Sequence, residues 1–300
     1  MKNPLGHSRR QGHGRSVLAL FGLMLMLLAV AACSPQAPKP TGPAAVYENA
    51  KDMFGRGRFD KAVEITDNLA AQSPADAYTE KARVLRAALF SAEVNASKDA
   101  AEAYEKGADA TRNPHFKAEY QRLRHDSLQV AATRAVELGE TAQQITAGGG
   151  FDKDFTLDAP YPTTEGPMAV AQYEKVRQGA WIEPQDQEAA ASDGELKGID
   201  DALAAIVGGD RSKAREALGA GPVTLKGVDF ALYLGNELVT GATLFDRKHN
   251  RDPLKLRALC NAADEIAKGV QAQLKASPNP DAAKKLKKLQ DQIKTTLKNV

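Results

Sequence analysis

Apolar residues recur at spacings of three and four along most of the chain from residue 44 onward. This is the pattern of helices that bury one face, and prolines and glycines divide it into segments joined by short turns. A short strand is predicted only where Phe155 and Leu157 follow Phe151 among aspartates. The sequence therefore predicts an all-α fold. Its 43% hydrophobic and 26% charged content excludes a chain that is disordered throughout or that crosses a membrane many times.

The first 32 residues have the organisation of an export signal. Four basic residues and no acidic residue precede the apolar stretch 17–32. That stretch has 16 residues, fewer than the roughly 20 that a membrane-spanning helix needs, and small residues end it. We therefore predict that residues 1–32 are a signal peptide that is removed from the mature protein.

The apolar stretch ends in Val30-Ala31-Ala32-Cys33, which resembles the lipobox of bacterial lipoproteins. The resemblance implies that the signal is cut before Cys33, that the Cys33 sulfur carries a diacylglycerol, and that a fatty acid such as palmitate caps the new amine. Ser34 follows instead of Asp, which in that family favours the outer membrane. The alternative is an ordinary secretory signal in which Cys33 has no such role.

A proline-rich segment follows the predicted cleavage point. Residues 34–43 contain four prolines, so the segment 33–43 is predicted to be an extended tether of roughly 30 Å. Without residues 1–32 the chain holds 36 basic and 38 acidic residues, a net charge of −2. This balance gives no reason to expect a nucleic-acid partner.

The first two predicted helices resemble a tetratricopeptide repeat. They flank the turn 55–58, and the match covers one 34-residue unit, 43–76. Five positions carry the small, turn, aromatic, small and terminating residues of that repeat: Ala50, Gly57, Phe59, Ala62 and Pro74. The resemblance implies a region of stacked helical hairpins, an α-solenoid, over residues 44–147.

The remaining pattern divides the chain further. We predict helices at 78–94, 97–111 and 114–145, and then an irregular linker or lid over 148–193, where four prolines stand and 168–178 is one more helical candidate. Helical order returns over 194–300, which we interpret as partly degenerate repeats of the same design. Its predicted helices are 196–207, 211–218, 228–248 and 253–276.

The last segment, 281–300, is predicted to be a basic amphipathic helix. It holds six lysines and two aspartates, and its apolar residues stand three and four apart. One interpretation is a capping helix that covers the last apolar face of a solenoid. The other is contact with anionic lipid or an acidic partner.

No catalytic motif is found, so we expect no enzyme, cofactor or metal site. The sequence lacks the G-x-S-x-G, S-x-x-K, H-E-x-x-H, C-x-x-C and phosphate-loop patterns. Asp152, Asp154 and Asp158 offer oxygen ligands for Ca²⁺, but they equally suit a solvated strand edge. The histidines beyond the signal, at 115, 125 and 249, fit surface or helix-end positions, and Cys260 fits a buried thiol.

Two functional hypotheses remain. The first is a non-catalytic scaffold, lipid-anchored at the bacterial outer membrane and facing the periplasm, that presents a groove to another envelope protein. The alternative is a solute-binding accessory lipoprotein of a transport system, with Tyr161, Tyr173 and Trp181 as candidate contacts. An enclosed cavity would favour the solute, and an open groove would favour a protein partner.

Overall fold

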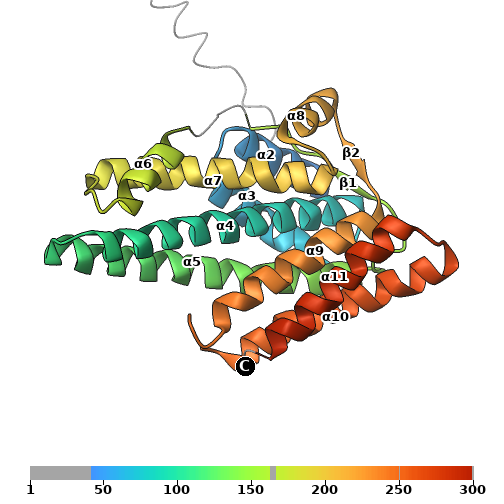
Figure 1. Ribbon diagram of the computed structural model, residues 1–300. Helices are drawn as coiled ribbons and strands as arrows, with labels where there is room; N and C mark the ends of the chain where they lie inside the picture. The colour runs from blue at the N-terminus through green and yellow to red at the C-terminus, as the bar shows by residue number, and fades with distance from the viewer. Residues whose placement is uncertain (1–41, 163–166, 250, 299–300) are drawn as a thin grey trace, which may run out of the picture. The chain divides into compact units, whose positions relative to one another are not determined.

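The computed structural model describes residues 42–162, 167–249 and 251–298, which belong to one compact unit, Thr41–Val300. Ten α-helices, one 3-10 helix and two three-residue strands make up this part (Figure 1), so the all-α prediction is confirmed. The predicted signal peptide, Cys33 and nearly all of the tether lie outside the described residues. In chain order the elements are α2 (Pro43–Gly55), α3 (Phe59–Ala70), α4 (Ala77–Ala110), α5 (Pro114–Ala147), β1 (Phe155–Leu157), α6 (Pro167–Arg177), α7 (Pro184–Val207), α8 (Arg211–Ala220), β2 (Val223–Leu225), α9 (Gly227–Ala242), the 3-10 helix Thr243–Phe245, α10 (Pro253–Ala276) and α11 (Pro280–Leu297).

Helices α2 and α3 form the first predicted hairpin. Gly57 takes a positive φ of 69° in the turn, a conformation that favours glycine. Ala50 and Ala62 are fully buried, and the rings of Phe54 and Phe59 meet edge to face at 5.4 Å. The small residues thus lie where two helices pack against each other, as the predicted hairpin requires.

Helix α4 is one continuous helix, whereas the sequence pattern predicted two helices with a break near residue 95. Asp76 caps its N-terminus by accepting a hydrogen bond from the Thr79 backbone. Ser97 and the residues after it have the composition of a second cap, but they continue the helix. The break was predicted wrongly because packing on several sides of α4 outweighs a weak local signal.

Helix α4 is the centre of the fold. It packs against α3, α5, α6, α7 and β1, and it also touches α9. In Figure 1 it lies between α7 on one side and α5 on the other. Stacked repeats need contacts only between successive hairpins, whereas α4 meets α7 and α9, which come more than 70 residues later. The all-α class therefore holds, while the solenoid arrangement is not confirmed and stays a prediction.

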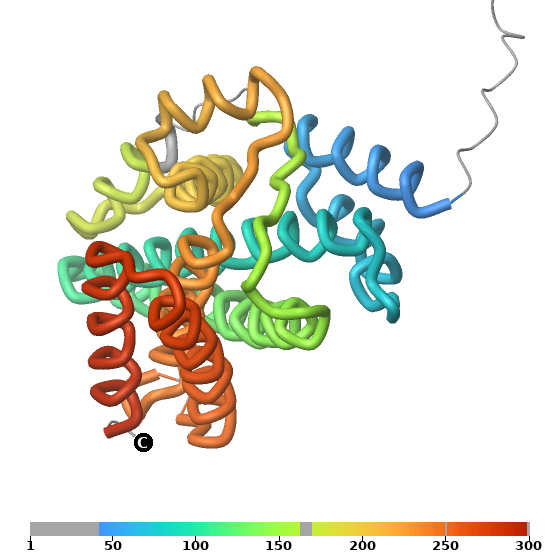
Figure 2. Tube along the Cα trace, turned by 90° about the vertical axis from the view of Figure 1, so that its right-hand side faces the viewer, coloured from blue at the N-terminus to red at the C-terminus, as the bar shows by residue number. Residues whose placement is uncertain are grey.

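The segment 148–193, predicted to be irregular, contains regular elements in the structure. The short strand expected around Phe155 exists as β1, and it pairs antiparallel with β2, which was not predicted. Figure 2 shows these two segments, lime and orange, running side by side. Helix α6 lies where one more helix was expected, and α7 begins at Pro184, ten residues before the predicted return at Gly194. Proline in the first turn of a helix removes no needed hydrogen bond, so Pro184 starts a helix instead of interrupting one.

The C-terminal helices pack on one another and on α5. Helix α10 has the predicted bounds, 253–276, with Asp252 as its cap, while α9 ends at Ala242, earlier than predicted. The apolar face of α11, including Leu286, Leu289 and Ile293, is buried against α9 and α10, as a capping helix requires. The helices of the described ranges include none with an apolar stretch long enough to cross a bilayer.

Candidate functional site

An open groove runs along α4, and we call it the acidic groove. Its volume is about 680 Å³, and α5 and α7 form its two long walls. It extends along α4 from Glu93 to Tyr104, which is roughly 16 Å at the rise of an α-helix. Its lining comprises Asp60, Glu93, Ala96, Ser97, Ala100, Tyr104, Leu123, Asp126, Ser127, Val130, Arg134, Tyr173, Pro184, Gln187, Glu188, Ala191, Ser192 and Glu195.

Small residues give the acidic groove its depth. Between Glu93 and Tyr104, α4 contributes Ala96, Ser97 and Ala100 to the lining, and larger side chains there would fill the space. Beyond the groove α7 lies very close to α4, because a Cβ atom on Gly198 would stand 2.7 Å from the Ala92 carbonyl oxygen. Only glycine permits this approach, so the close contact at Gly198 fixes one end of the α7 wall.

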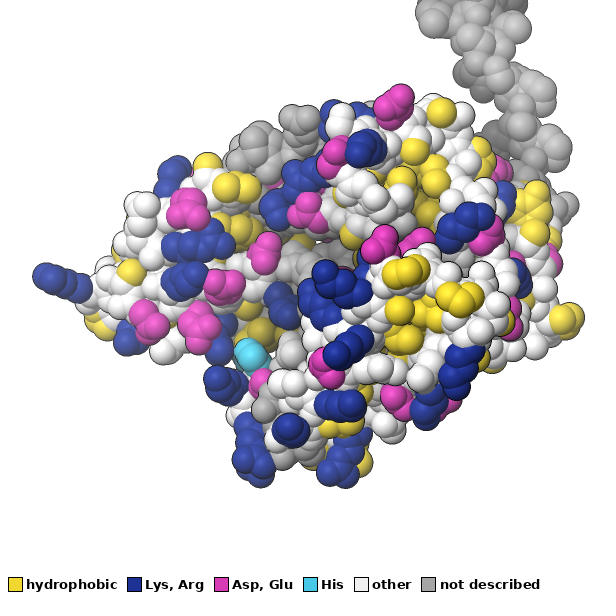
Figure 3. Space-filling model, turned by 45° about the vertical axis from the view of Figure 1, so that its right-hand side comes forward, with side chains coloured by type: hydrophobic (Ala, Val, Ile, Leu, Met, Phe, Trp, Pro, Cys, Tyr) yellow, Lys and Arg dark blue, Asp and Glu magenta, His cyan; other side chains and the backbone are white. Residues whose placement is uncertain are grey.

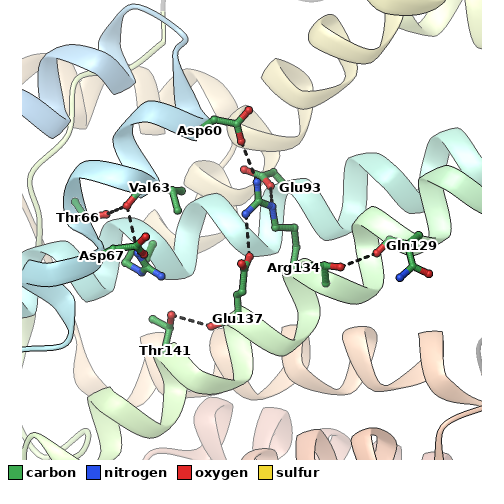
Figure 4. A network of polar contacts seen from close by, with 11 residues as sticks. Asp60, Val63, Thr66, Asp67, Glu93, Gln129, Arg134, Glu137 and Thr141 are labelled. Atoms are coloured by element: carbon green, nitrogen blue, oxygen red, sulfur yellow. Dashed lines mark hydrogen bonds and ion pairs between the residues drawn. The ribbon is translucent and has the colours of Figure 1, made fainter.

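The lining carries an excess of negative charge. Five carboxylates line the groove, those of Asp60, Glu93, Asp126, Glu188 and Glu195, and Arg134 is the one basic side chain among the lining residues. That guanidinium is already occupied: it forms ion pairs with Asp60 and Glu137, both at 2.9 Å, and with Glu93. Figure 4 shows Arg134 between the three carboxylates, which come from α3, α4 and α5. Asp126 pairs with Arg122 at 2.6 Å, so Glu188 and Glu195 are the groove carboxylates without an ion pair to a described residue.

Two of these carboxylates are held in an unfavourable environment for charge. Burial, together with the nearby charges of Glu195 and Asp60, raises the pKa of Glu93 to about 7 against the attraction of Arg134. Burial and Asp60 likewise raise the pKa of Glu195 to about 7, again opposed by Arg134. Glu93 Oε1 is buried and has no hydrogen-bond partner among the described residues. A cation entering the groove would favour the ionised form of both groups.

Glu195→Gln should stabilise the protein at pH 8 and have little effect at pH 5. A carboxyl whose pKa is raised by folding takes up protons as the chain folds, so wild-type stability falls as pH rises from about 5 through 7. The amide removes that cost, and we expect a gain on the order of 2 kcal/mol at pH 8. Urea unfolding at both pH values measures it. The control is Glu188→Gln, an exposed glutamate on the same helix; equal gains in both variants, or at both pH values, would contradict the assignment.

The three aromatic residues predicted to line one pocket are separated in the structure. Tyr173 lines the acidic groove and meets Tyr104 edge to face at 6.2 Å. Trp181 lies in the same apolar cluster but stacks on Phe116, at 5.0 Å, outside the groove lining. Tyr161 belongs to a different cluster, with the Arg215 guanidinium over its ring. Of these three aromatic residues, only Tyr173 therefore lines the acidic groove.

The three aspartates considered for calcium are also separated in the structure. Asp158 pairs with Lys51 and Lys81, both at 2.7 Å, and these contacts lower its pKa against the effect of burial. Asp154 pairs with Lys226 at 2.7 Å. The remaining one, Asp152, accepts a hydrogen bond from a glutamine of α10. The structure does not gather them into one site; they bind the segment around β1 to α2, α4, α9 and α10.

The histidines and the second cysteine have structural surroundings. His115 stacks near Trp181, His249 contacts Asp246, and His125 is exposed on α5. Cys260 is fully buried in α10, and burial raises the pKa of its thiol to about 11, which keeps it unreactive. Within the described part of the chain, no three His, Cys, Asp or Glu side chains form a group that could hold a metal ion.

The sequence pattern did not point to Glu93, Glu195 or Arg134. One signal was present: Glu93 follows an apolar run of α4 in which most side chains are buried, and a carboxylate there is unusual. Glu195 and Arg134 carry no such sequence signal, because they meet only when α5 and α7 pack on α4.

Comparison with known proteins adds nothing to the assignment, since no family model, no curated protein and no solved structure matches this chain.

Proposed function

We propose that this protein is a non-catalytic, lipid-anchored adaptor of the bacterial cell envelope that faces the periplasm. In the acidic groove it binds an extended, lysine- or arginine-rich segment of another envelope protein. The observation that carries the proposal is the open groove itself, which five carboxylates line, two of them, Glu188 and Glu195, without an ion pair to a described residue. The lipid anchor at Cys33 and the outer-membrane location rest on the lipobox resemblance.

The dimensions of the groove suit a short stretch of extended chain. At about 3.3 Å per residue, its length of roughly 16 Å accommodates about five residues. Tyr104 and Tyr173 lie at one end and Val130, which is 49% exposed, lies on the α5 wall. Both tyrosines are buried, so Val130 offers the exposed apolar surface that suits the alkyl stems of lysine and arginine, while the carboxylates pair with the charged ends.

The alternative, a solute-binding accessory of a transporter, has less support. A small solute is normally enclosed over most of its surface, whereas the acidic groove is open to solvent. The aromatic side chains expected to surround a solute are dispersed. The repeat-like design remains part of the proposal only for α2 and α3, whose buried small residues and paired phenylalanines suit a tetratricopeptide hairpin.

Crosslinking in intact cells tests the partner. A photoreactive residue replaces Val130 on the groove wall, and a second strain carries it at Leu254, which is 77% exposed outside the groove. We expect Val130 to capture a defined peptide rich in lysine or arginine, and Leu254 not to capture it. A neutral or acidic peptide at Val130, or the same peptide at both positions, would overturn the proposal.

Binding of the captured segment, made as a synthetic peptide, should depend on the groove carboxylates. The triple variant Asp126→Asn, Glu188→Gln, Glu195→Gln should bind at least about tenfold more weakly. A control triple, Asp109→Asn, Glu140→Gln, Glu216→Gln, removes the same charge from exposed positions outside the groove and should bind nearly as well as the wild type.

Binding should also be tighter at pH 8 than at pH 5, because Glu93 and Glu195 are ionised only at the higher value. Fluorescence anisotropy measures all three, and equal losses in the two triples would reject the groove as the binding site.

A further inference from the structure

A second cavity, which we call the lysine pocket, lies between α4, α9 and α11. Its volume is about 560 Å³, and it is a shallow depression that is more open to solvent than the acidic groove. Ser97 lines the acidic groove and Lys98 lines the lysine pocket, and successive residues on a helix point about 100° apart. The two cavities therefore lie on different sides of α4. The lining comprises Lys98, Val239, Thr240, Thr243, Lys284, Lys287, Lys288, Asp291, Gln292, Thr295 and Thr296.

The charge of the lysine pocket is opposite to that of the acidic groove. Four ammonium groups and one carboxylate, Asp291, line it. No ion pair links the lysines of this pocket to any residue that the structure describes, although many other lysines of this chain are paired in that way. In Figure 3, dark blue side chains outnumber magenta ones over the lower part of the molecule, where the C-terminal helices lie. The pocket therefore carries net positive charge that the protein does not neutralise.

Lys98 is the least solvated of these cations. It is largely buried, and its Nζ donates only long hydrogen bonds, of 3.5 Å each, to the Thr240 carbonyl oxygen and Thr243 Oγ1. Burial lowers its pKa, against the opposing effect of Glu237, Asp99 and Asp246, none of which lies within ion-pair distance. Lys98 thus has carboxylates near it but no ion pair with them, and an anion in the pocket would give this largely buried ammonium group a direct partner.

The other side chains of the pocket are mostly polar. Four threonines and Val239 line it, and two of the threonine hydroxyls already donate to backbone carbonyl oxygens, that of Thr243 to Thr240 and that of Thr295 to Asp291. Gln292 Oε1 is buried with no hydrogen-bond partner among the described residues, and as an acceptor it suits a donor rather than an anion, so the lysines alone carry the anion site. Four ammonium donors around one open depression suit the oxygens of a phosphate group.

We propose that the lysine pocket binds a phosphate-bearing ligand, with Lys98 at its base and Lys284, Lys287 and Lys288 at its rim. The proposal is independent of the partner in the acidic groove. It also gives the basic helix α11 a role besides covering α9 and α10: its apolar face stabilises the fold while its lysines bind the ligand. The ligand is a soluble phosphate compound or the headgroup of a lipid, and the experiment distinguishes the two.

The test uses residues 34–300, which contain the whole compact unit and lack the predicted lipid site. Isothermal titration with inorganic pyrophosphate reports soluble phosphates, and co-sedimentation with phosphatidylcholine vesicles, with or without phosphatidylglycerol, reports headgroups. Lys98→Met keeps the buried alkyl stem and should fold normally, which its thermal unfolding checks. This variant and the double variant Lys287→Gln, Lys288→Gln should each weaken binding at least about tenfold.

The control double variant Lys117→Gln, Lys275→Gln removes two exposed lysines that do not line the pocket. Pyrophosphate binding that is lost in the pocket variants and kept in the control supports a soluble ligand. Vesicle binding with the same pattern, and without pyrophosphate binding, supports a lipid headgroup. Absence of both, or equal losses in the pocket variants and the control, would overturn the proposal.

Discussion

Replacement of Cys33 by alanine should move the protein from the membrane fraction to the soluble fraction of the cell envelope. If the lipobox is used, Cys33 carries three acyl chains, and each buried methylene contributes about 0.8 kcal/mol to membrane binding, so two chains already anchor a protein stably. Without Cys33 there is no acceptor for the diacylglycerol. We therefore expect nearly complete release, measured by fractionation and immunoblotting, with unchanged helical circular dichroism.

The chain supplies a matched control for this experiment. Cys260→Ala removes the other cysteine, which is fully buried in α10, and should leave the protein in the membrane fraction. Mass spectrometry of the native protein should find acyl groups on the wild type and on the Cys260 variant. Membrane retention of the Cys33 variant, or an unmodified N-terminus in the wild type, would reject the anchor and the location inferred from it.

Removal of Arg134 should produce the largest loss of stability among single substitutions in the acidic groove. Its guanidinium pairs with Glu93, Asp60 and Glu137, and Glu93 is buried. Breaking a buried ion pair typically costs about 3 to 5 kcal/mol when the remaining charge persists, but Glu93, whose pKa is about 7, can take up a proton at pH 8, which limits the loss to about 1 to 3 kcal/mol. We expect a loss of this size for Arg134→Met at pH 8, measured by urea unfolding.

The loss should become smaller at low pH. The pKa of Glu93 is about 7 in the folded protein, so at pH 5 this carboxyl is neutral and no longer needs its partner. The double variant Glu93→Gln, Arg134→Met should for the same reason lose less than Arg134→Met at pH 8. Arg122→Met is the control, since Arg122 stands on the same helix with exposed partners and should change stability little at either pH. An equal loss at pH 5 and pH 8 would argue that Arg134 acts through packing alone.

Elements with strong local signals were predicted well from sequence. Asp252 followed by Pro253 marks the start of α10, and a regular apolar face carries it to residue 276. The first hairpin was equally clear, because a glycine turn separates two amphipathic segments. The predicted break within α4 was wrong, since a serine that resembles a cap is accommodated inside a helix packed on several sides. Local sequence signals therefore predict helix boundaries well where few packing contacts compete with them.

The acidic groove could not be predicted in the same way. Its walls, α5 and α7, come from segments about 60 residues apart that each pack on α4, and α7 does so through the close approach at Gly198. No periodicity reports such an approach, and of its charged residues only Glu93 stood out. The lysine pocket was partly visible as the basic helix 281–300, but the contribution of Lys98 depends on how α11 packs across α9.

The pairing of β1 with β2 places the two ends of the segment 158–222 next to each other. Leu157 faces Val223 in the pairing, and paired strands lie about 5 Å apart, so the chain leaves and returns at one point. Helices α6, α7 and α8 thus belong to a segment whose two ends meet at this strand pair. The helices α4, α5, α9, α10 and α11 form a frame, because they pack on one another without that segment. A shortened homologue joining residue 157 to 223 by a tight turn would keep that frame and the lysine pocket, but it would have lost one whole wall of the acidic groove.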